Sequence, residues 1–255
     1  MKRSLGLTAV LTLVACGGTP PIQEVEQGLA TATTIGRSIS LALDGVAGTN
    51  TSCVQVVKAC STFPCDGEAN VTLGNACPLA TGAATGTVNV TGRWNSATQG
   101  ELTAVFTDVK VGDEAASAVA SVKKVSVERS GNTITVEYSG SDAVAAAGSS
   151  VAAVGASNKW TLKIATQGTA EAADDVLTVD ATSALGNAGA GTQAKTVKIK
   201  GVVFSPSCTK NPTAGTADIT EVTNFIPRIT EIEFGSACDG TAKVNGASTE
   251  INFFR

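Results

Sequence analysis

The 255-residue chain contains no histidine. Ser-His-Asp and Cys-His catalysis both need an imidazole base, so this absence excludes both classes of nucleophilic enzyme. It also excludes metal sites built on histidine ligands. The sequence has neither a Gly-x-x-x-x-Gly-Lys phosphate loop nor a Gly-x-Ser-x-Gly nucleophile turn. We therefore expect a non-enzymatic protein and assign no catalytic, cofactor-binding or metal-binding residue.

Basic residues are also scarce: 18 Lys and Arg stand against 22 Asp and Glu, for a net charge of -4. No long basic run occurs. Because binding to nucleic acid depends on neutralising phosphates with clustered Lys and Arg, nucleic acid is not an expected partner.

A long hydrophobic run is missing as well. The apolar stretch 5–15 follows Lys2 and Arg3, and it is shorter than the roughly 20 residues that a transmembrane helix needs. A basic start followed by a short apolar segment is typical of a cleaved export signal.

The end of this stretch, Leu13-Val14-Ala15-Cys16, resembles the lipobox of bacterial lipoprotein precursors. The resemblance implies that the signal 1–15 is removed and that Cys16 carries a diacylglycerol and an acylated amino terminus. The membrane would then be a partner through the lipid anchor. Gly17 stands where an Asp tends to retain such proteins in the inner membrane, which favours the outer membrane. A plain secretory signal with an incidental cysteine is the alternative.

Beyond Cys16 the sequence divides simply. Residues 16–21 predict a tether, because two glycines are followed by an extended Pro pair. Residues 22–255 predict a single β-rich domain, with a possible subdivision near 140–157, where Ala, Gly and Ser dominate.

The domain begins with a predicted helix over 22–46. Apolar or small residues recur there at alternating steps of three and four, which is the stripe of an amphipathic helix. Its members are Ile22, Val25, Leu29, Ala32, Gly36, Ile39, Leu43 and Val46. We expect this stripe to pack on a sheet.

After the helix the apolar pattern changes to period two, which predicts about ten strands. In the clearest case Gly131-Asn132 forms a two-residue turn that pairs Val127 with Val136, so that apolar meets apolar. The expected fold is mainly β: an antiparallel meander forming a β-sandwich or open barrel, with one N-terminal helix. Trp94 and Trp160 continue apolar strand faces and are expected to be buried.

Six cysteines remain when Cys16 is set aside, and an even number in an exported chain predicts three disulfides. Cys208 is expected to pair with Cys238, in a loop closure worth roughly 3–4 kcal/mol. The other four are expected to pair among themselves: Cys53, Cys60, Cys65 and Cys77. A four-thiolate metal site is the rival interpretation, although Cys-x-x-Cys spacings are absent.

Carboxylates are the remaining source of catalysis. Asp174 and Asp175 are adjacent, so on a strand their side chains point to opposite faces, and we interpret them as a solvated strand start. Glu231 and Glu233 share one face of a predicted strand and are interpreted as a polar outer face.

The sequence thus favours an outer-membrane-anchored lipoprotein of the cell envelope with a structural or protein-binding role, whose partner would be another envelope or surface protein. One alternative is a lipid-anchored carrier for a small apolar or sugar ligand, held between helix and sheet near Trp94, Tyr138 and Trp160. A carboxylate-based hydrolase is a further alternative.

Overall fold

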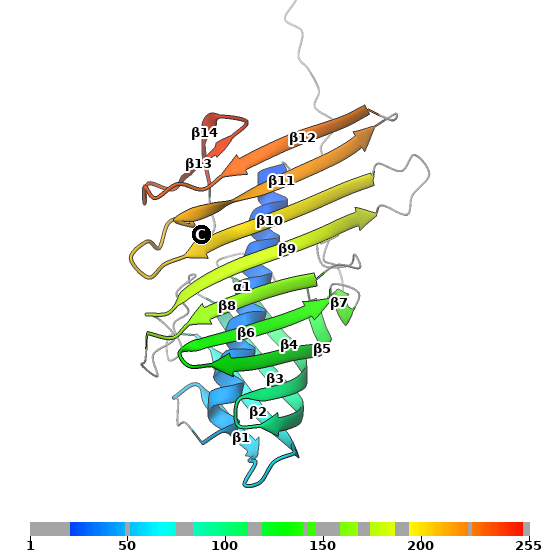
Figure 1. Ribbon diagram of the computed structural model, residues 1–255, viewed down its shortest axis with the longest axis vertical. Coiled ribbons are helices and arrows are strands. Elements are labelled where there is room, and N and C mark those ends of the chain that lie inside the picture. The colour runs from blue at the N-terminus through cyan, green and yellow to red at the C-terminus, as the bar shows by residue number, and fades with distance from the viewer. Residues whose placement is uncertain are drawn as a thin grey trace, which may run out of the picture.

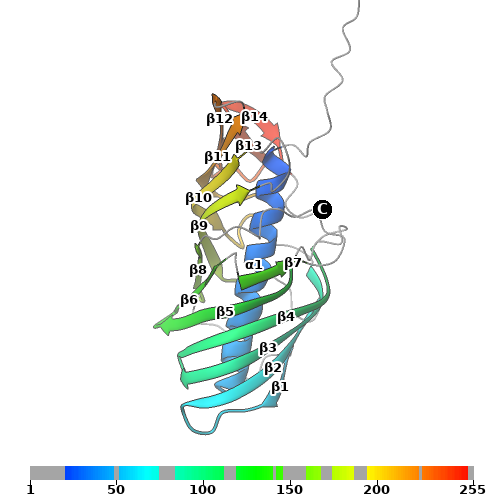
Figure 2. The same ribbon diagram turned by 90° about the vertical axis from the view of Figure 1, so that its right-hand side faces the viewer.

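In a computed structural model of the chain, one helix lies along the concave face of one long curved sheet (Figures 1 and 2). The structure describes residues 21–48, 52–74, 84–111, 119–139, 142–145, 159–167, 174–186, 194–223 and 226–251. The helix α1 spans Pro21–Val46. The strands are β1 Val54–Lys58, β2 Cys65–Leu73, β3 Ala84–Ser96, β4 Gln99–Val111, β5 Val119–Ser130, β6 Thr133–Ser139, β7 Ala143–Ala145, β8 Lys159–Ala165, β9 Val176–Gly186, β10 Ala194–Phe204, β11 Ala214–Thr223, β12 Ile226–Glu233, β13 Thr241–Val244 and β14 Ala247–Glu250.

The strands form one antiparallel sheet in chain order, from β1 to β14, with β7 alone placed to the side against β5. The predicted antiparallel meander with one helix is confirmed. The sheet does not fold into two packed layers, because α1 occupies the concave side where a second layer would lie. β6 pairs directly with β8, so the sheet is continuous on either side of the stretch near 140–157.

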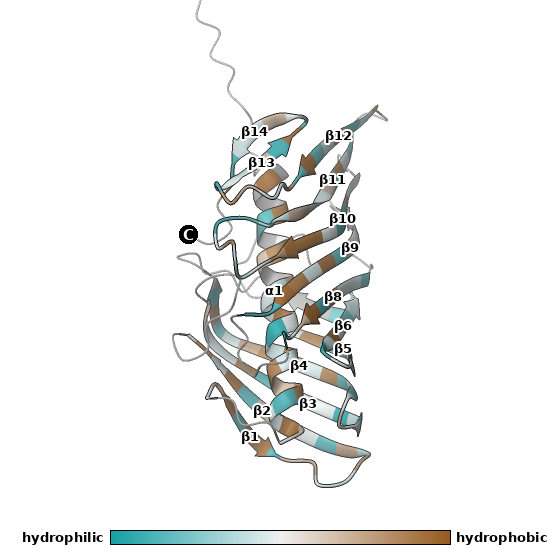
Figure 3. Cartoon of the chain, turned by 60° about the vertical axis from the view of Figure 1, so that its left-hand side comes forward, coloured by the Kyte–Doolittle hydropathy of each residue, from teal (hydrophilic) through white to brown (hydrophobic). Residues whose placement is uncertain are grey.

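The β5–β6 hairpin has the predicted register. Ser130 pairs with Thr133 around a two-residue turn, and Val127 pairs with Val136. Along the strands hydrophobic and hydrophilic residues alternate, as Figure 3 shows. The hydrophobic side chains of this alternation are buried against α1, while the opposite face of the sheet carries the polar ones.

The helix is more enclosed than its sequence predicts. The apolar stripe packs on the sheet as expected, but residues of the opposite face are buried too, including Thr33, Thr34, Ser38 and Ser40. Three of these hydroxyls bond to the helix backbone: Thr33 and Thr34 donate to Ala30 O at 2.9 Å, and Ser38 donates to Thr34 O at 2.8 Å. Such bonds satisfy a buried hydroxyl locally, which lets a polar helix face lie in the interior.

The helix runs along the sheet, crossing its strands, and contacts β1 to β6, β8 and β9. Two glycines bring it close. A Cβ on Gly36 would lie 2.7 Å from Leu162 Cδ2, and a Cβ on Gly45 would lie 2.5 Å from Val54 Cγ1. The middle of α1 therefore packs on β8, and its C-terminal end packs on β1.

Candidate functional site

The strongest concentration of buried charge lies between the middle of α1 and the start of β9. Arg37 Nη1 donates to Asp175 Oδ2, and Arg37 Nη2 donates to the Asp175 main-chain oxygen at 3.3 Å. The two side chains are 1% and 5% exposed. A guanidinium that bonds both the carboxylate and the main chain of one residue fixes the position of α1 relative to β9.

Burial perturbs both members of this pair. Removal from water disfavours each charged form, so it lowers the pKa of Arg37 and raises the pKa of Asp175. The charge of each partner opposes the shift of the other, and the nearby Asp174 carboxylate also acts on both. The pair is thus held together by mutual attraction in a setting that is costly for either charge alone.

This pair corrects the sequence interpretation of Asp174 and Asp175 as a solvated strand start. Asp175 is buried, at 4% exposure, because α1 extends over the beginning of β9. Sequence reasoning also missed Arg37. A signal was present: Arg37 is the only charged residue between Gln27 and Asp44, in a helix segment otherwise made of apolar, small and hydroxylated residues.

A second ion pair joins the C-terminal end of α1 to the sheet. Arg129, at the end of β5, donates through Nη2 to Asp44 Oδ1, and the two side chains are 29% and 18% exposed. Burial raises the pKa of Asp44, and the charge and hydrogen bond of Arg129 oppose that rise. Two arginine–aspartate pairs therefore connect α1 to the sheet, one near its middle and one near its C-terminal end.

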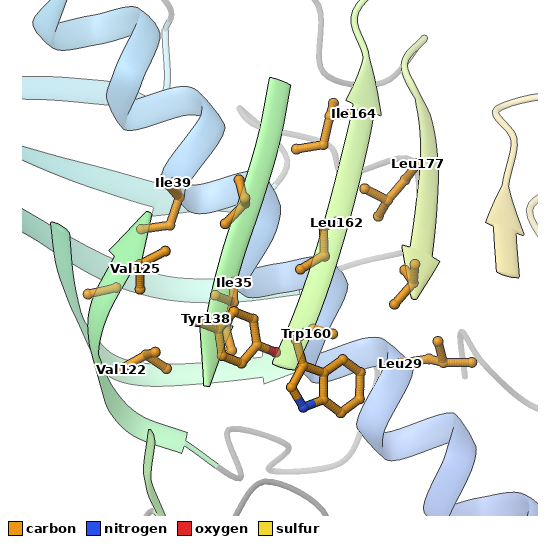
Figure 4. Packing of buried hydrophobic residues seen from close by; sticks show 14 of the residues in the cluster. Leu29, Ile35, Ile39, Val122, Val125, Tyr138, Trp160, Leu162, Ile164 and Leu177 are labelled. Atoms are coloured by element: carbon orange, nitrogen blue, oxygen red, sulfur yellow. The ribbon is translucent and has the colours of Figure 1, made fainter. Parts of the chain in front are cut away.

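The aromatic residues proposed for a ligand groove are part of the core. Trp94 and Trp160 are 0% and 3% exposed, which confirms their predicted burial. Tyr138 lies parallel to Trp160, with ring centroids 6.1 Å apart, and its burial raises the pKa of its hydroxyl. Figure 4 shows Tyr138 and Trp160 in the same cluster of buried residues as Ile35 of α1. Beside these rings, Gly36 brings α1 into direct contact with Leu162 of β8.

A disulfide joins two loops at one edge of the sheet. Cys208, in the β10–β11 connection, is bonded to Cys238, in the β12–β13 connection, with 5.4 Å between their Cα atoms. Asn211 lies beside it, fully buried. Its Nδ2 donates to Ala237 O at 2.9 Å, and its Oδ1 accepts from Gly240 N at 3.0 Å. Disulfide and amide together hold the two loops as one unit.

The N-terminal cysteines are also oxidised in the described part of the chain. Cys60 is bonded to Cys65, with Cα atoms 5.9 Å apart, and Cys53 is disulfide-bonded as well. A four-thiolate metal site that uses both Cys60 and Cys65 is incompatible with this bond. Cys77 and the predicted lipidation site Cys16 lie outside the described residues.

The other predicted acidic groups do not converge. Glu231 and Glu233 are exposed on β12, and Glu233 Oε2 lies 3.7 Å from Lys243 Nζ. Among the residues that the structure describes, no three side chains of the metal-binding types come close enough together to hold an ion. The Arg37–Asp175 and Arg129–Asp44 pairs instead fasten the helix to the sheet.

Comparison with protein-family models, curated proteins and solved structures gives no match. Within the described ranges, no helix has both the length and the apolar character needed to cross a membrane.

Proposed function

We propose that this protein is an outer-membrane-anchored lipoprotein of the cell envelope that acts without catalysis, in a structural or protein-binding role. The observation that carries the proposal is that the buried aspartates are paired with arginines between the helix and the sheet. Asp175 and Asp44, whose pKa values burial raises, face Arg37 and Arg129 within the helix–sheet interface. They serve to hold the helix in place, whereas an acid or base in catalysis must reach a substrate.

The start of the folded body supports the anchor. The helix begins at Pro21, five residues after Cys16. Fully extended, the segment from Cys16 to Pro21 spans at most about 17 Å. A lipid on Cys16 would therefore hold the first turn of α1 within that distance of the bilayer surface. Three acyl chains, as the lipobox resemblance implies, give far more stable anchoring than the marginal binding of one.

The opposite end of the molecule supports a protein-binding role. α1 begins beside β12–β14 and ends beside β1 and β2 (Figures 1 and 2). An anchor that precedes the helix would therefore leave β1 and β2 at the far end of the molecule. The Cys60–Cys65 disulfide closes the β1–β2 connection, where Phe63 is 37% exposed. A cross-linked loop loses little conformational freedom on binding, and a partly exposed aromatic residue is a favourable contact for a partner.

The carrier alternative is not adopted. It needs an apolar cavity between helix and sheet, whereas α1 lies in direct contact with Leu162 of β8 at Gly36 and with Val54 of β1 at Gly45. The hydrolase alternative is not adopted either, because Asp175 is engaged by Arg37 and buried.

The anchor is tested by mass spectrometry of the mature amino terminus and by fractionation of the envelope. We expect a triacylated Cys16 as the first residue and release of the protein by detergent alone. A Cys16→Ser variant should keep its signal and carry no lipid. An unmodified mature terminus at any other residue would contradict the proposal.

The role is tested separately by native pull-down of the detergent-solubilised, lipidated protein. We expect a stoichiometric envelope protein that is lost in a Phe63→Ser variant and retained in a Val105→Ser variant. Val105 is the matched control, because it is exposed to a similar degree, at 42%, on β4, two strands away from β2 in the sheet. Turnover of an envelope substrate by the purified wild type would contradict the non-enzymatic role.

A further inference from the structure

The first residues of β12 form an exposed apolar end of the sheet. Ile226 and Ile229 are 65% and 59% exposed, the two most exposed large hydrophobic residues in the described part of the chain. Pro227 and Arg228 between them are exposed as well. We call this segment, Ile226–Ile229, the β12 tip. Four consecutive exposed residues, three of them apolar, are unusual in a strand that elsewhere hides one face.

Both faces of the tip are open. Alternate residues of a strand point to opposite sides, so Ile226 and Arg228 belong to one face and Pro227 and Ile229 to the other. The register with β11 places Val222 beside Pro227 and Thr223 beside Ile226. The exposed residues thus surround the end of the β11–β12 hairpin. A flat partner laid on one face of the sheet would leave half of this apolar surface in water.

The edge of the tip is poorly suited to pairing with another strand. β13 pairs only with Ile232 and Glu233 of β12. Glu231 exchanges hydrogen bonds with Asn245, which shows that its backbone groups point away from β11. By the two-residue period, the backbone groups of Ile229 and Pro227 point to the same open side. Pro227 has no N–H to donate there, and proline at a sheet edge opposes strand addition.

The position of the tip indicates what covers it. β12 lies at the end of the long axis where α1 begins, while the C-terminal end of α1 contacts β1 at the other end (Figures 1 and 2). If Cys16 is lipidated, the tether of at most about 17 Å turns this end toward the bilayer. The exposed apolar residues then lie on the membrane-facing end of the molecule.

We propose that the β12 tip enters the interfacial layer of a phospholipid bilayer. The inference rests on the proposed lipid anchor. Ile226, Pro227 and Ile229 enter end-on, so that both faces of the hairpin meet acyl chains, and Arg228 stays at the level of the phosphates, its stem covering apolar surface. With the lipid on Cys16 this makes a second contact, which fixes the orientation of the body and points the β1–β2 end away from the bilayer.

The test places a tryptophan at the tip of the lipidated protein. Ile229→Trp is reconstituted into vesicles of phosphatidylethanolamine and phosphatidylglycerol with brominated acyl chains, which quench fluorescence on contact. Val57→Trp is the matched control, since Val57 is 54% exposed on β1 at the other end. The parent protein supplies the background of the two buried native tryptophans. Unchanged thermal midpoints show that each variant is folded.

We expect the fluorescence of the tryptophan in Ile229→Trp to shift to shorter wavelength and to be quenched by the brominated lipid. The fluorescence of Val57→Trp should be unaffected. Adding Ile226→Ser to Ile229→Trp should lower the ratio of docked to undocked molecules about tenfold, from the loss of apolar burial. Mass spectrometry of Cys16 is done on the same sample. If Cys16 is lipidated but the tryptophan at position 229 is not quenched, the contact between the β12 tip and the bilayer is refuted while the lipid anchor is upheld.

Two other outcomes overturn the proposal in distinguishable ways. An unlipidated terminus refutes the anchor, and the tip contact falls with it. A blue shift at 229 without bromine quenching, together with a doubled mass in detergent, shows that a second copy of the chain covers the tip instead of lipid.

Discussion

Replacing Arg37 and Asp175, singly and together, tests how the buried ion pair contributes to the stability of the fold. Arg37→Met leaves a buried carboxylate without its partner, and Asp175→Leu leaves a buried guanidinium. Removing one member of such a pair costs about 3–5 kcal/mol. Domains are typically stable by only about 5–15 kcal/mol. At about 2–4 °C per kcal/mol for a chain of this size, each single variant should melt roughly 6–20 °C lower.

The double variant should behave differently. Burial disfavours both charges, lowering the pKa of Arg37 and raising that of Asp175, so the pair attracts strongly but is costly to desolvate. Apolar side chains of similar volume remove the desolvation cost together with the attraction. We expect Arg37→Met/Asp175→Leu to be close to wild type, or more stable by about 1–4 kcal/mol.

The loss of stability in the single Arg37→Met variant should also depend on pH. A carboxyl whose folded pKa is raised is favoured in the folded state while protonated, and its stability contribution is lost as pH rises through that pKa. Without Arg37 the pKa of Asp175 rises further. The deficit of Arg37→Met should therefore be largest at neutral pH and shrink as pH falls toward about 4, near the ordinary pKa of aspartate.

The assay is urea denaturation with the disulfides intact, in which the midpoint and slope are read together. Lys159→Met is the control, because its ion pair with Glu137, at 2.6 Å, has a lysine side chain that is 65% exposed. It should change stability by less than about 1 kcal/mol. A single Arg37→Met loss as small as this control, or a double loss equal to the sum of the singles, would refute the reasoning.

Three further predictions concern other parts of the fold. Replacing Cys208 and Cys238 together by serine should lower the free energy of unfolding by roughly 3–4 kcal/mol, measured by urea denaturation; an unchanged midpoint would show that Asn211 alone holds the loops. The pKa of Asp239, lowered by hydrogen bonds from Thr241, should move back toward its ordinary value in Thr241→Val when followed by NMR titration. Because the pKa of Asp239 is lowered in the folded protein, its contribution to folding stability is present above the ordinary pKa of about 3.9 and is lost as pH falls through the lowered pKa. Identical titration curves for Asp239 in the wild type and in Thr241→Val would contradict this. Gly36→Leu should destabilise by about 1–3 kcal/mol through its contact with β8, and an unchanged melting temperature would mean that the interface is looser than described.

Much of the fold follows from local pattern. The period of the apolar residues is enough to predict the helix over 22–46 and the meander, because helix and strand place every fourth and every second residue on one side. The β5–β6 hairpin follows from turn and pattern together, since Gly131-Asn132 sets the register that pairs Val127 with Val136. Six strands were not predicted: β1, β2, β7, β11, β13 and β14. Four of these, β1, β7, β13 and β14, have only three to five residues, which carry too little periodic signal.

The candidate site depends on contacts that no local pattern contains. Arg37 and Asp175 are 138 residues apart in the chain. The isolation of Arg37 in an uncharged helix segment hints at burial, but nothing in the sequence identifies Asp175 as its partner. They meet because the sheet curves around the helix and encloses its second face.

The sequence by itself determined the helix, the antiparallel meander and the register of the β5–β6 hairpin. It also gave rise to the expectations of disulfides and of an anchored, non-catalytic protein. These depend on composition and on residues close together in the chain. Only the tertiary structure decided that α1 is buried on all sides over residues 32–43, that its lone arginine needs Asp175, and that the β12 tip lies at the end of the molecule where α1 begins. The physical reason is curvature: the bend of a many-stranded sheet is a property of all its strands together. That bend determines which polar residues are enclosed and which apolar ones remain exposed.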